Sequence, residues 1–508
     1  MKYNIVILDE AHERSIYTDI LFALVKAAVK KRNGSLKLIV TSATLNTDMF
    51  SKYFDNCPVL KMEGKCYPVD VKYHHTPANL RVEEAVKKAI RLHLHEGLGH
   101  ILVFLTGSEE CEQAVKRTHE ILEDLISKGK EVPSALIFSL YGAQSSEDQH
   151  KVFESVDEDT RKIVYSTNIA ETSITIDGVG FVIDSGHVKQ KQYNPKTGMD
   201  CLMVVPISKV QAVQRMGRAG RTMEGKCLRM YSEKFFNEQM ENTTMPEILR
   251  VNLTSLILTL KCIGIDDVLQ FDYMERPDDD LIIEALKQLH ILNAIEEDGK
   301  VNDFGREMCK LPMEPHFSKS LLISKYLDCQ DDVLTVVALL SSEKLFVSVS
   351  RGHVERHQQF LDTLPKLMMK EGDHATMNRI FKEWKREGRS DRYARNNFIN
   401  ARALHQAENI RGQIGDLIST INYKIVENFL CTDHIYKLSK TISLKDYSRN
   451  ERLAMSLCSS FFFNAARRVH TMSEDYLLIS EGNMVNLDPS CAFSVLHTFP
   501  EYLIFSEL

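Results

Sequence analysis

Arginine recurs at every third position in one part of the sequence, as Arg215, Arg218 and Arg221. On a helical turn this spacing places the three guanidinium groups near one face. Gly217 and Gly220 have no side chains, so a ligand can approach that face closely. Guanidinium is planar, permanently charged and able to bind two phosphate oxygens at once. The pattern therefore predicts a phosphate-binding face, although a solvated basic helix is the ordinary alternative.

An apolar run near the start of the chain, Ile5 to Leu8, ends at Asp9 and Glu10. Such a run predicts a buried parallel strand that delivers its acids to the carboxyl edge of a sheet, where open α/β folds bind ligands. There, Asp9 could hold Mg²⁺ through its water shell and Glu10 could activate a water molecule as a general base. Asp-Glu after a strand is also common as a helix N-cap.

A polar stretch follows another apolar run and extends from Ser166 to Gly178 as Ser-Thr-Asn-Ile-Ala-Glu-Thr-Ser-Ile-Thr-Ile-Asp-Gly. Its hydroxyls, amide and carboxylates stand where a loop would enter a helix, a setting suited to binding sugar and phosphate oxygens. Serine and threonine in such numbers can also simply cap a helix. The stretch is therefore a candidate nucleic-acid contact, with capping as the alternative.

Short apolar runs alternate with longer charged amphipathic segments from Ile5 to about Ser208. This alternation is typical of βαβ units around a parallel sheet, and polar or small residues follow most of the runs. The predicted strands are Ile5 to Leu8, Leu36 to Val40, Ile101 to Leu105, Leu136 to Leu140, Lys162 to Tyr165 and Phe181 to Ile183.

Prolines interrupt this alternation between Cys57 and Pro77, and we interpret that stretch as a link between two domains. Two extended pieces, 188–193 and 201–205, predict a β-hairpin around a Pro/Gly turn. After Arg221 the pattern becomes helical, and an Asp-Gly turn at 296–301 predicts a small hairpin beside a helix, as in a winged helix.

Composition limits the class of protein. A chain of 508 residues, 44% hydrophobic and 26% charged, predicts a globular protein of three or four domains. The net charge of −7 argues against a uniformly basic surface, so any positive charge for nucleic acid must be local. The eleven cysteines form no zinc-type spacing, and neither a signal peptide nor a membrane span is indicated.

Three short motifs in a fixed order, Asp9-Glu10-Ala11-His12, Ser42-Ala43-Thr44 and Gln-Arg-Met-Gly-Arg-Ala-Gly-Arg at 214–221, resemble those of the DEAH-box family of RNA helicases. The resemblance extends along essentially the whole chain and implies an α/β protein with two RecA-like domains followed by smaller modules. The implied domains are a partial first RecA-like domain (1–67), a complete second RecA-like domain (68–244), a winged helix (245–310), a helical bundle or ratchet (311–427) and a partial OB-fold (428–508).

The family's reaction is ATP hydrolysis with Mg²⁺, and the resemblance distributes its steps over five residues. Glu10 would act as the base, and Gln214 would orient the attacking water. Arg218 and Arg221 would be arginine fingers, which neutralise charge on the transferred phosphoryl group. Asp9 would hold the metal.

Further nucleotide contacts are also implied by the resemblance. Phe153 matches the aromatic residue that stacks on the adenine, although a lone phenylalanine is otherwise a core residue. Ser173 would sense the γ-phosphate, and Thr175 with Asp177 would approach the ribose. His12 would hydrogen-bond the water-positioning glutamine across the cleft.

The same resemblance implies that Thr167 and Asn168 contact the RNA backbone, while Ser42 and Thr44 couple the nucleotide state to the RNA. For the Ser-Ala-Thr stretch, an ordinary turn is the alternative. Recognition of a single RNA strand would be largely independent of sequence, because phosphates and 2′-hydroxyls are read. A protein activator at the C-terminal modules and a nuclear location follow only from the family.

One family motif, the phosphate loop G-x-x-x-x-G-K-[ST], does not occur in the sequence. Compared with the family, the first RecA-like domain starts late and the OB-fold ends early. We therefore expect a helicase that moves 3′-to-5′ and remodels RNA–protein complexes, but no ATPase from residues 1 to 508 alone. A non-catalytic RNA- or protein-binding fragment, or an incomplete gene model, is the alternative.

Overall fold

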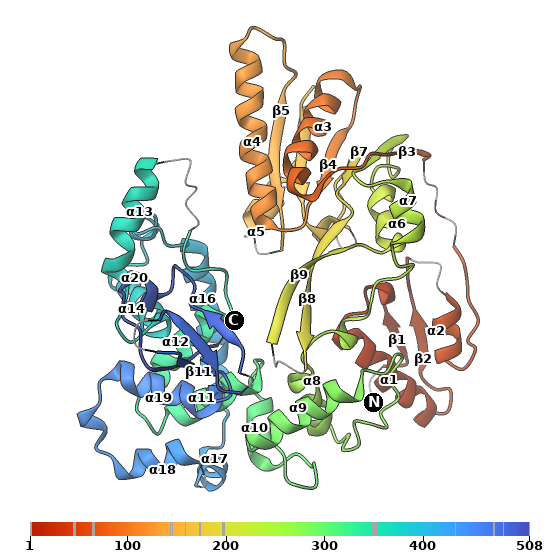
Figure 1. Cartoon of the computed structure of the whole chain (residues 1–508). Helices are drawn as coiled ribbons and strands as arrows, with labels where there is room; N and C mark the ends of the chain where they lie inside the picture. Colours follow the sequence, from red (N-terminus) through yellow and green to blue (C-terminus); the bar gives the residue numbers. More distant parts are fainter. Residues whose placement is uncertain are drawn as a thin grey trace. The chain divides into compact units, whose positions relative to one another are not determined.

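The computed structural model describes residues 3–43, 47–62, 64, 67–142, 144, 146–157, 159–171, 174–195, 199–347, 354–431, 433–470, 473–480 and 482–506. The chain forms two compact units (Figure 1). The first comprises Met1–Tyr193, Cys201–Val251 and Asp272–Arg276, and the second comprises Asn194–Asp200, Asn252–Phe271 and Pro277–Leu508. Throughout these described ranges, no helix combines the length and the apolar character needed to cross a bilayer.

The first unit begins with a small parallel sheet of two strands, β1 (Ile5–Leu8) and β2 (Lys37–Val40), connected by η1 (Ala11–Glu13) and α1 (Ile16–Lys31) and followed by α2 (Thr47–Tyr53). Both strands were predicted, but the expectation of burial is wrong for one face. Ile5, Ile7 and Ile39 alternate with half-buried neighbours and are exposed. Alternate side chains lie on opposite faces of a strand, so only one face of this sheet is covered.

A six-stranded sheet forms the centre of the first unit, in the order β3-β10-β7-β4-β6-β5 and with every pair parallel. The chain belongs to the mixed α/β class, as predicted. The strands are β3 (Val69–Tyr73), β4 (His100–Phe104), β5 (Ala135–Leu140), β6 (Arg161–Ser166), β7 (Val179–Asp184) and β10 (Gly225–Arg229). The helical segments around them are η2 (Ala78–Leu80), α3 (Arg81–His95), α4 (Ser108–Ser127), α5 (Ser146–Lys151), η3 (Asn168–Ala170), α6 (Lys209–Gly217), α7 (Glu233–Glu238) and η4 (Glu247–Leu249).

Both faces of this sheet are buried, as β4 shows. Ile101 and Val103 pack in one core with α3 and α4, whereas Leu102 and Phe104 pack in a second core on the opposite face (Figure 1). A strand covered on both faces reads as a continuous apolar run, which is why the run from Ile101 to Leu105 was recognisable in the sequence.

Two strands of the sheet were not predicted. β3 lies inside the stretch that we interpreted as an interdomain link, so that interpretation is too wide at its C-terminal end. β3 is an edge strand, where a proline immediately before the first residue removes no necessary hydrogen bond. β10 is short and follows the stretch of arginines and glycines, so its apolar pattern was not recognised as a strand.

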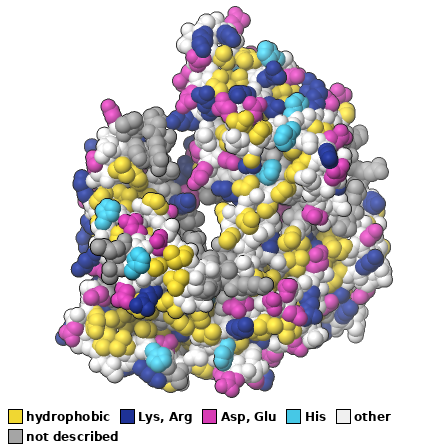
Figure 2. Space-filling model, viewed as in Figure 1, with side chains coloured by type: hydrophobic (Ala, Val, Ile, Leu, Met, Phe, Trp, Pro, Cys, Tyr) yellow, Lys and Arg dark blue, Asp and Glu magenta, His cyan; other side chains and the backbone are white. Residues whose placement is uncertain are grey.

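The predicted hairpin is confirmed as β8 (His187–Asn194) paired with β9 (Met199–Pro206). On the face drawn in Figure 2, basic and acidic side chains are interspersed rather than segregated, in keeping with the modest net charge. On this face, positive charge for an anionic ligand must therefore come from particular side chains and not from a broad basic surface.

The second unit is mainly helical. An antiparallel bridge between Ile295 and Val301 closes the predicted Asp-Gly turn. The helical segments are α8 (Thr254–Cys262), α9 (Asp279–Ile291), α10 (Asp303–Cys309), α11 (Pro315–Ser324), α12 (Gln330–Leu340), α13 (Val354–Leu367), α14 (Asp373–Arg386), α15 (Asp391–Asn396), α16 (Ala401–Ile418), α17 (Tyr423–Leu430), α18 (His434–Thr441), η5 (Leu444–Asp446), α19 (Arg449–Phe461) and α20 (Ala492–Val495). An antiparallel sheet, in the order β13-β12-β11-β14, follows α19 and contains β11 (Ala465–Arg468), β12 (Asp475–Leu478), β13 (Met484–Asn486) and β14 (Tyr502–Ile504).

Candidate functional site

The carboxylate of Asp9 lies at the carboxyl edge of the two-stranded sheet. Leu8 pairs with Val40, so Asp9 and Thr41 leave the sheet side by side. The Thr41 hydroxyl and the Glu10 backbone N–H (2.9 Å) both donate to Oδ1 of Asp9. These two bonds, led by that of Thr41, lower the pKa of Asp9, because they stabilise the charged form. The Asp9 carboxylate is therefore kept in its ionised form. Neither of the two donors binds its other oxygen, Oδ2, and a metal-bound water would fit there as the partner.

Glu10 has a left-handed backbone conformation (φ 51°), which turns the chain sharply from β1 into η1. Its side chain stays 44% exposed, so its carboxylate is accessible to a water molecule. Among the described residues, no group of three or more His, Cys, Asp or Glu side chains could enclose a metal ion. A magnesium ion here would depend on Asp9, water and ligand phosphates, which is its usual set of partners with nucleotides.

His12 is nearly buried beside this edge. Its Nδ1 accepts from the Ala43 backbone N–H (3.2 Å), and its Nε2 lies 3.4 Å from Glu10 Oε2 without the geometry of a hydrogen bond. The expected bond to Gln214 is not formed in this structure. Instead, Nε2 of His12 and Nε2 of Gln214 are each buried without a hydrogen-bond partner among the described residues.

Ser42 follows Thr41 directly and is exposed. Two of the predicted site residues, Thr44 and Ser173, lie outside the described residues.

Arg215 is fully buried, which corrects the expectation of a three-arginine face. α6 starts at a Ser208 capping box and ends at Gly217, so Arg218 is its C-cap residue and Arg221 lies beyond the helix. The three-residue spacing therefore does not place the three side chains on one helical surface. Arg215 points into the protein, Arg218 is also largely buried with 7% exposure, and Arg221 is exposed.

Two carboxylates surround the Arg215 guanidinium. Nε donates to Glu171 Oε2 and Nη1 donates to Asp184 Oδ1, each at 2.9 Å. Tyr231 donates to the other Asp184 oxygen (2.8 Å), and the Phe104 ring lies 4.9 Å from the guanidinium carbon. Burial raises the pKa of Glu171, while Arg215 opposes that shift. We call Arg215, Glu171, Asp184 and Tyr231 the Arg215 network; it ties η3, the end of β7 and α6 together.

Arg218 and Arg221 form hydrogen bonds with Glu171, Ile174 and Thr175. Arg218 donates to the carbonyl oxygens of Ile174 (2.8 Å) and Glu171, and Arg221 donates to the Thr175 hydroxyl. Burial and the neighbouring Arg221 lower the pKa of Arg218 to about 10, and the negative charges of Glu171 and Glu10 oppose this. Arg218 is thus still cationic at neutral pH and lies within the field of the Glu10 carboxylate.

Phe153 is 40% exposed, so it is not the core residue that a lone phenylalanine would suggest. Lys162 holds its backbone from both sides, donating to the carbonyl oxygens of Val152 (2.8 Å) and Glu154. Burial lowers the pKa of Lys162, and the negative charges of Glu154 and Asp177 oppose this shift. Sequence reasoning missed Lys162; a lysine on an otherwise apolar buried strand was the available signal.

Thr167 and Asn168 follow β6 at the carboxyl edge of the large sheet. The Thr167 side chain makes no capping bond to η3, and Asn168 is exposed. The preceding Ser166 hydroxyl is instead buried and donates to the Leu140 carbonyl (3.0 Å). Helix capping therefore does not account for the threonine at position 167. The side chains of Thr167 and Asn168 can contact a ligand at the surface.

The chain is similar to known protein families and to a known protein. Residues 83–223 match the helicase conserved C-terminal domain, 285–313 the winged-helix part of the helicase associated domain (HA2), and 314–417 its ratchet-like part. The chain is 39% identical over 507 residues to a fission yeast (Schizosaccharomyces pombe) protein, the pre-mRNA-splicing factor ATP-dependent RNA helicase prp22. That alignment covers all of this chain and 41% of the relative.

The two glycines of the arginine stretch differ in what surrounds them, and this gives a test. A Cβ on Gly220 would lie 2.6 Å from the Tyr67 carbonyl oxygen and 2.8 Å from Val69, whereas one on Gly217 would meet nothing within 4 Å. We expect Gly220→Ala to destabilise the chain by about 1–3 kcal/mol through strain at β3, and Gly217→Ala to change stability by less than about 0.5 kcal/mol.

Urea denaturation of the two variants beside the parent chain measures both effects. Equal stability of the two variants would contradict the close approach of Gly220 to β3.

Proposed function

Since the chain belongs to the DEAH-box family of RNA helicases, we propose that it acts in an ATP-dependent RNA helicase that moves 3′-to-5′ along RNA and remodels RNA–protein complexes. The chain spans about two fifths of the length of the curated relative that it matches, so the activity of a whole protein is part of the proposal. The observation that carries it is that Arg218 and Arg221 hydrogen-bond to Glu171, Ile174 and Thr175, a few residues after Thr167 and Asn168 in the chain.

The nucleotide would be ATP with Mg²⁺. We assign Asp9 to the metal, Glu10 to the attacking water as general base, and Gln214 to the orientation of that water. ATP would supply the phosphates that complete the ligand set of the metal.

Arg218 and Arg221 would neutralise the charge that develops on the transferred phosphoryl group. On the same domain, Phe153 would stack on the base, and Thr175 with Asp177 would approach the ribose. Support comes from the exposure of Phe153 and from the hydrogen bond that Arg221 donates to the Thr175 hydroxyl.

Closure of the cleft would couple hydrolysis to RNA. Nε2 of His12 and Nε2 of Gln214 are both buried without partners, and a buried amide or imidazole N–H without a partner is unfavourable. A closure that brings the two side chains together with the nucleotide would satisfy them. Ser42 and Thr44 on one domain and Ser173 on the other would report the nucleotide state to Thr167 and Asn168.

The module boundaries remain part of the proposal. We propose a partial RecA-like domain over 1–67, a second over 68–244, a winged helix over 245–310, a ratchet over 311–427 and a partial OB-fold over 428–508. The antiparallel sheet of β11 to β14 supports the last of these. By analogy with the splicing relative, the partners would be single-stranded RNA, spliceosomal RNA–protein complexes and a protein activator at the C-terminal modules, and the location would be the nucleus.

RNA binding tests the RNA side of the proposal. We expect Thr167→Val to weaken the binding of a single-stranded RNA at least about tenfold, because a hydrogen bond to a charged phosphate contributes about 1.5–3 kcal/mol. Thr160→Val is the matched control, because Thr160 precedes β6 and lies at the opposite edge of the sheet. Fluorescence anisotropy of a labelled RNA measures both, and equal affinities for the two variants would count against the assignment.

We also propose that residues 1 to 508 by themselves hydrolyse ATP no faster than background. The sequence has no G-x-x-x-x-G-K-[ST], whose amides and lysine hold the phosphates, and one lost electrostatic contact in an active site commonly costs about 3 kcal/mol of transition-state stabilisation. Phosphate release, with and without RNA, measures the rate. RNA-stimulated turnover that Glu10→Gln abolishes would show this expectation to be wrong.

A further inference from the structure

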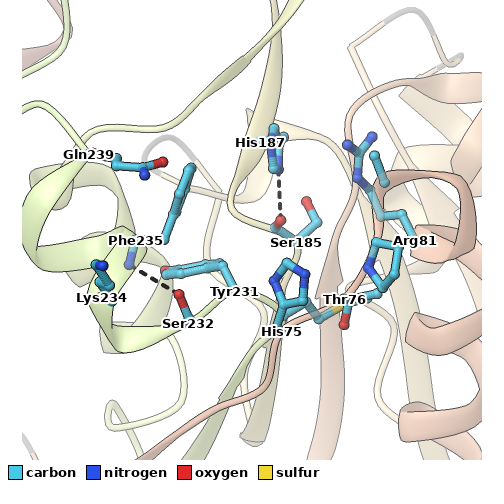
Figure 3. Close-up of a pocket in the computed structure, with 13 residues that line it drawn as sticks. His75, Thr76, Arg81, Ser185, His187, Tyr231, Ser232, Lys234, Phe235 and Gln239 are labelled. Carbon is cyan, nitrogen blue, oxygen red and sulfur yellow. Dashed lines mark hydrogen bonds between the residues drawn. The ribbon is translucent and has the colours of Figure 1, made fainter.

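A pocket of about 430 Å³ opens at the carboxyl edge of the large sheet, beyond β3, β10 and β7 (Figure 3). It is lined by residues that directly follow these three strands, together with residues of α3 and α7. Figure 3 shows Phe235 and Tyr231 on one side of the pocket and Arg81 on the other, with Ser185 and His187 between them. The volume is within the range of small-ligand pockets, which is about 300–1,000 Å³.

The lining of this pocket is suited to an anion. None of its lining residues, all of which the structure describes, is acidic, while Arg81 and Lys234 bring positive charge and His75 and His187 bring imidazoles. Arg81 also pairs with Glu110 (3.0 Å), which holds its guanidinium in place and offsets part of its charge. Lys234 is 77% exposed, so its charge lies at the rim of the pocket, and Glu238, at 3.9 Å, offsets part of it.

Ser185 indicates that the pocket is built for a polar ligand. The residue is only 3% exposed, and its hydroxyl oxygen is buried without a hydrogen-bond partner among the described residues. A buried hydroxyl left unpaired is destabilising by about 1–3 kcal/mol, so a ligand atom that pairs with it would be favoured. Ser185 lines the pocket, and a phosphate, sugar or base oxygen can accept its hydrogen.

The histidine beside it has a defined hydrogen-bonding pattern. The Ser185 carbonyl oxygen is 3.0 Å from Nδ1 of His187, and because a carbonyl can only accept, Nδ1 donates. Burial, together with the charges of Arg81 and Arg215, lowers the pKa of His187. The neutral ring therefore keeps Nε2 as an acceptor, which can receive an N–H or O–H from a ligand.

Aromatic rings also line the pocket. The Phe235 and His187 rings are nearly parallel, at 24° with centroids 6.3 Å apart, and the Tyr231 ring is fixed by its bond to Asp184 (2.8 Å). Aromatic faces of this kind support base stacking without selecting among the four bases. The pocket thus offers a stacking surface and anion-binding groups together, which is the combination that a nucleotide requires.

The pocket lies along the same sheet edge as Thr167 and Asn168. Only β4 separates β6, which precedes Thr167, from β7, which precedes Ser185. At about 4.8 Å between neighbouring strands the separation is roughly 10 Å, or about three nucleotides at the stacked rise of 3.4 Å. Lys189 lies over the end of the intervening strand, since its Nζ is 3.0 Å from the position of a Cβ on Gly107.

We propose that this pocket, between Arg81, Ser185 and Phe235, binds one nucleotide of the single-stranded RNA whose backbone Thr167 and Asn168 contact. The inference rests on the proposed RNA-binding function and extends the RNA path across Lys189 to the β3 side of the sheet. The proposed ligand is part of a strand and not a free nucleotide, because the pocket and the predicted backbone contacts lie along the same edge of the sheet.

Charge reversal at the rim tests the proposal on the complete 508-residue chain. Lys234→Glu is expected to weaken binding of an RNA of about 12 nucleotides at least about fivefold, because it puts an acid at the mouth of the pocket. Lys72→Glu is the matched control: Lys72 is also exposed (55%) and lies on β3, but it does not line the pocket. The control is expected to change affinity less than about twofold.

Cross-linking locates the nucleotide directly. RNAs that carry 4-thiouridine at a single position are bound to the chain and irradiated. The peptides that become cross-linked to the RNA are then identified by mass spectrometry. We expect one position to attach to a peptide that contains residues 75–81 or 230–239, and a position about three nucleotides away to attach near Asn168.

The outcomes separate the two proposals. If Thr167→Val weakens RNA binding but Lys234→Glu does not, and no position cross-links to the pocket peptides, the pocket proposal is overturned while the RNA-binding function stands. If neither variant affects binding, both are overturned. Saturation of the pocket by free uridine 5′-monophosphate that RNA does not displace would also overturn the pocket proposal.

Discussion

The buried ion pairs of Arg215 are the interaction on which the rest of the first unit depends. A guanidinium without any solvent exposure is tolerable only because Glu171 and Asp184 each accept a 2.9 Å hydrogen bond from it. Removing one partner of such a group leaves a charge buried and unpaired, which typically costs about 3–5 kcal/mol. Three separate pieces of chain, η3, the end of β7 and α6, are therefore fixed relative to one another at one point.

This constraint reaches both candidate ligand sites. The Glu171 carbonyl oxygen accepts from Arg218, and the proposed RNA contacts Thr167 and Asn168 lie four and three residues before Glu171. On the other side, Asp184 anchors Tyr231, a wall of the pocket, and is followed directly by Ser185. A movement at one of these sites must either move the Arg215 network or be resisted by it, which is a physical means for nucleotide and RNA binding to influence each other.

Much of the fold could be predicted from the sequence, because strands that are covered on both faces appear as apolar runs. The polar residues that follow these strands indicate the edge of the sheet at which ligands bind. The internal role of Arg215 was not readable. Its partners lie 44 and 31 positions away, and a three-residue spacing does not reveal that α6 ends at Gly217. The edge strand β3 was not predicted because a proline precedes it. The role of Lys162 was not predicted because the run that contains it indicated only a strand.

Amide hydrogen exchange on Arg215→Met tests the central role of the Arg215 network most directly, with Arg117→Met, at a 45% exposed arginine of α4 outside the network, as a control. The account predicts that loss of the buried guanidinium speeds exchange at least about tenfold in residues 166–178 and 209–221, while amides of β4 and β6 exchange at rates much closer to those of the parent chain. Unchanged exchange in 166–178, or equal acceleration across the whole sheet, would contradict it.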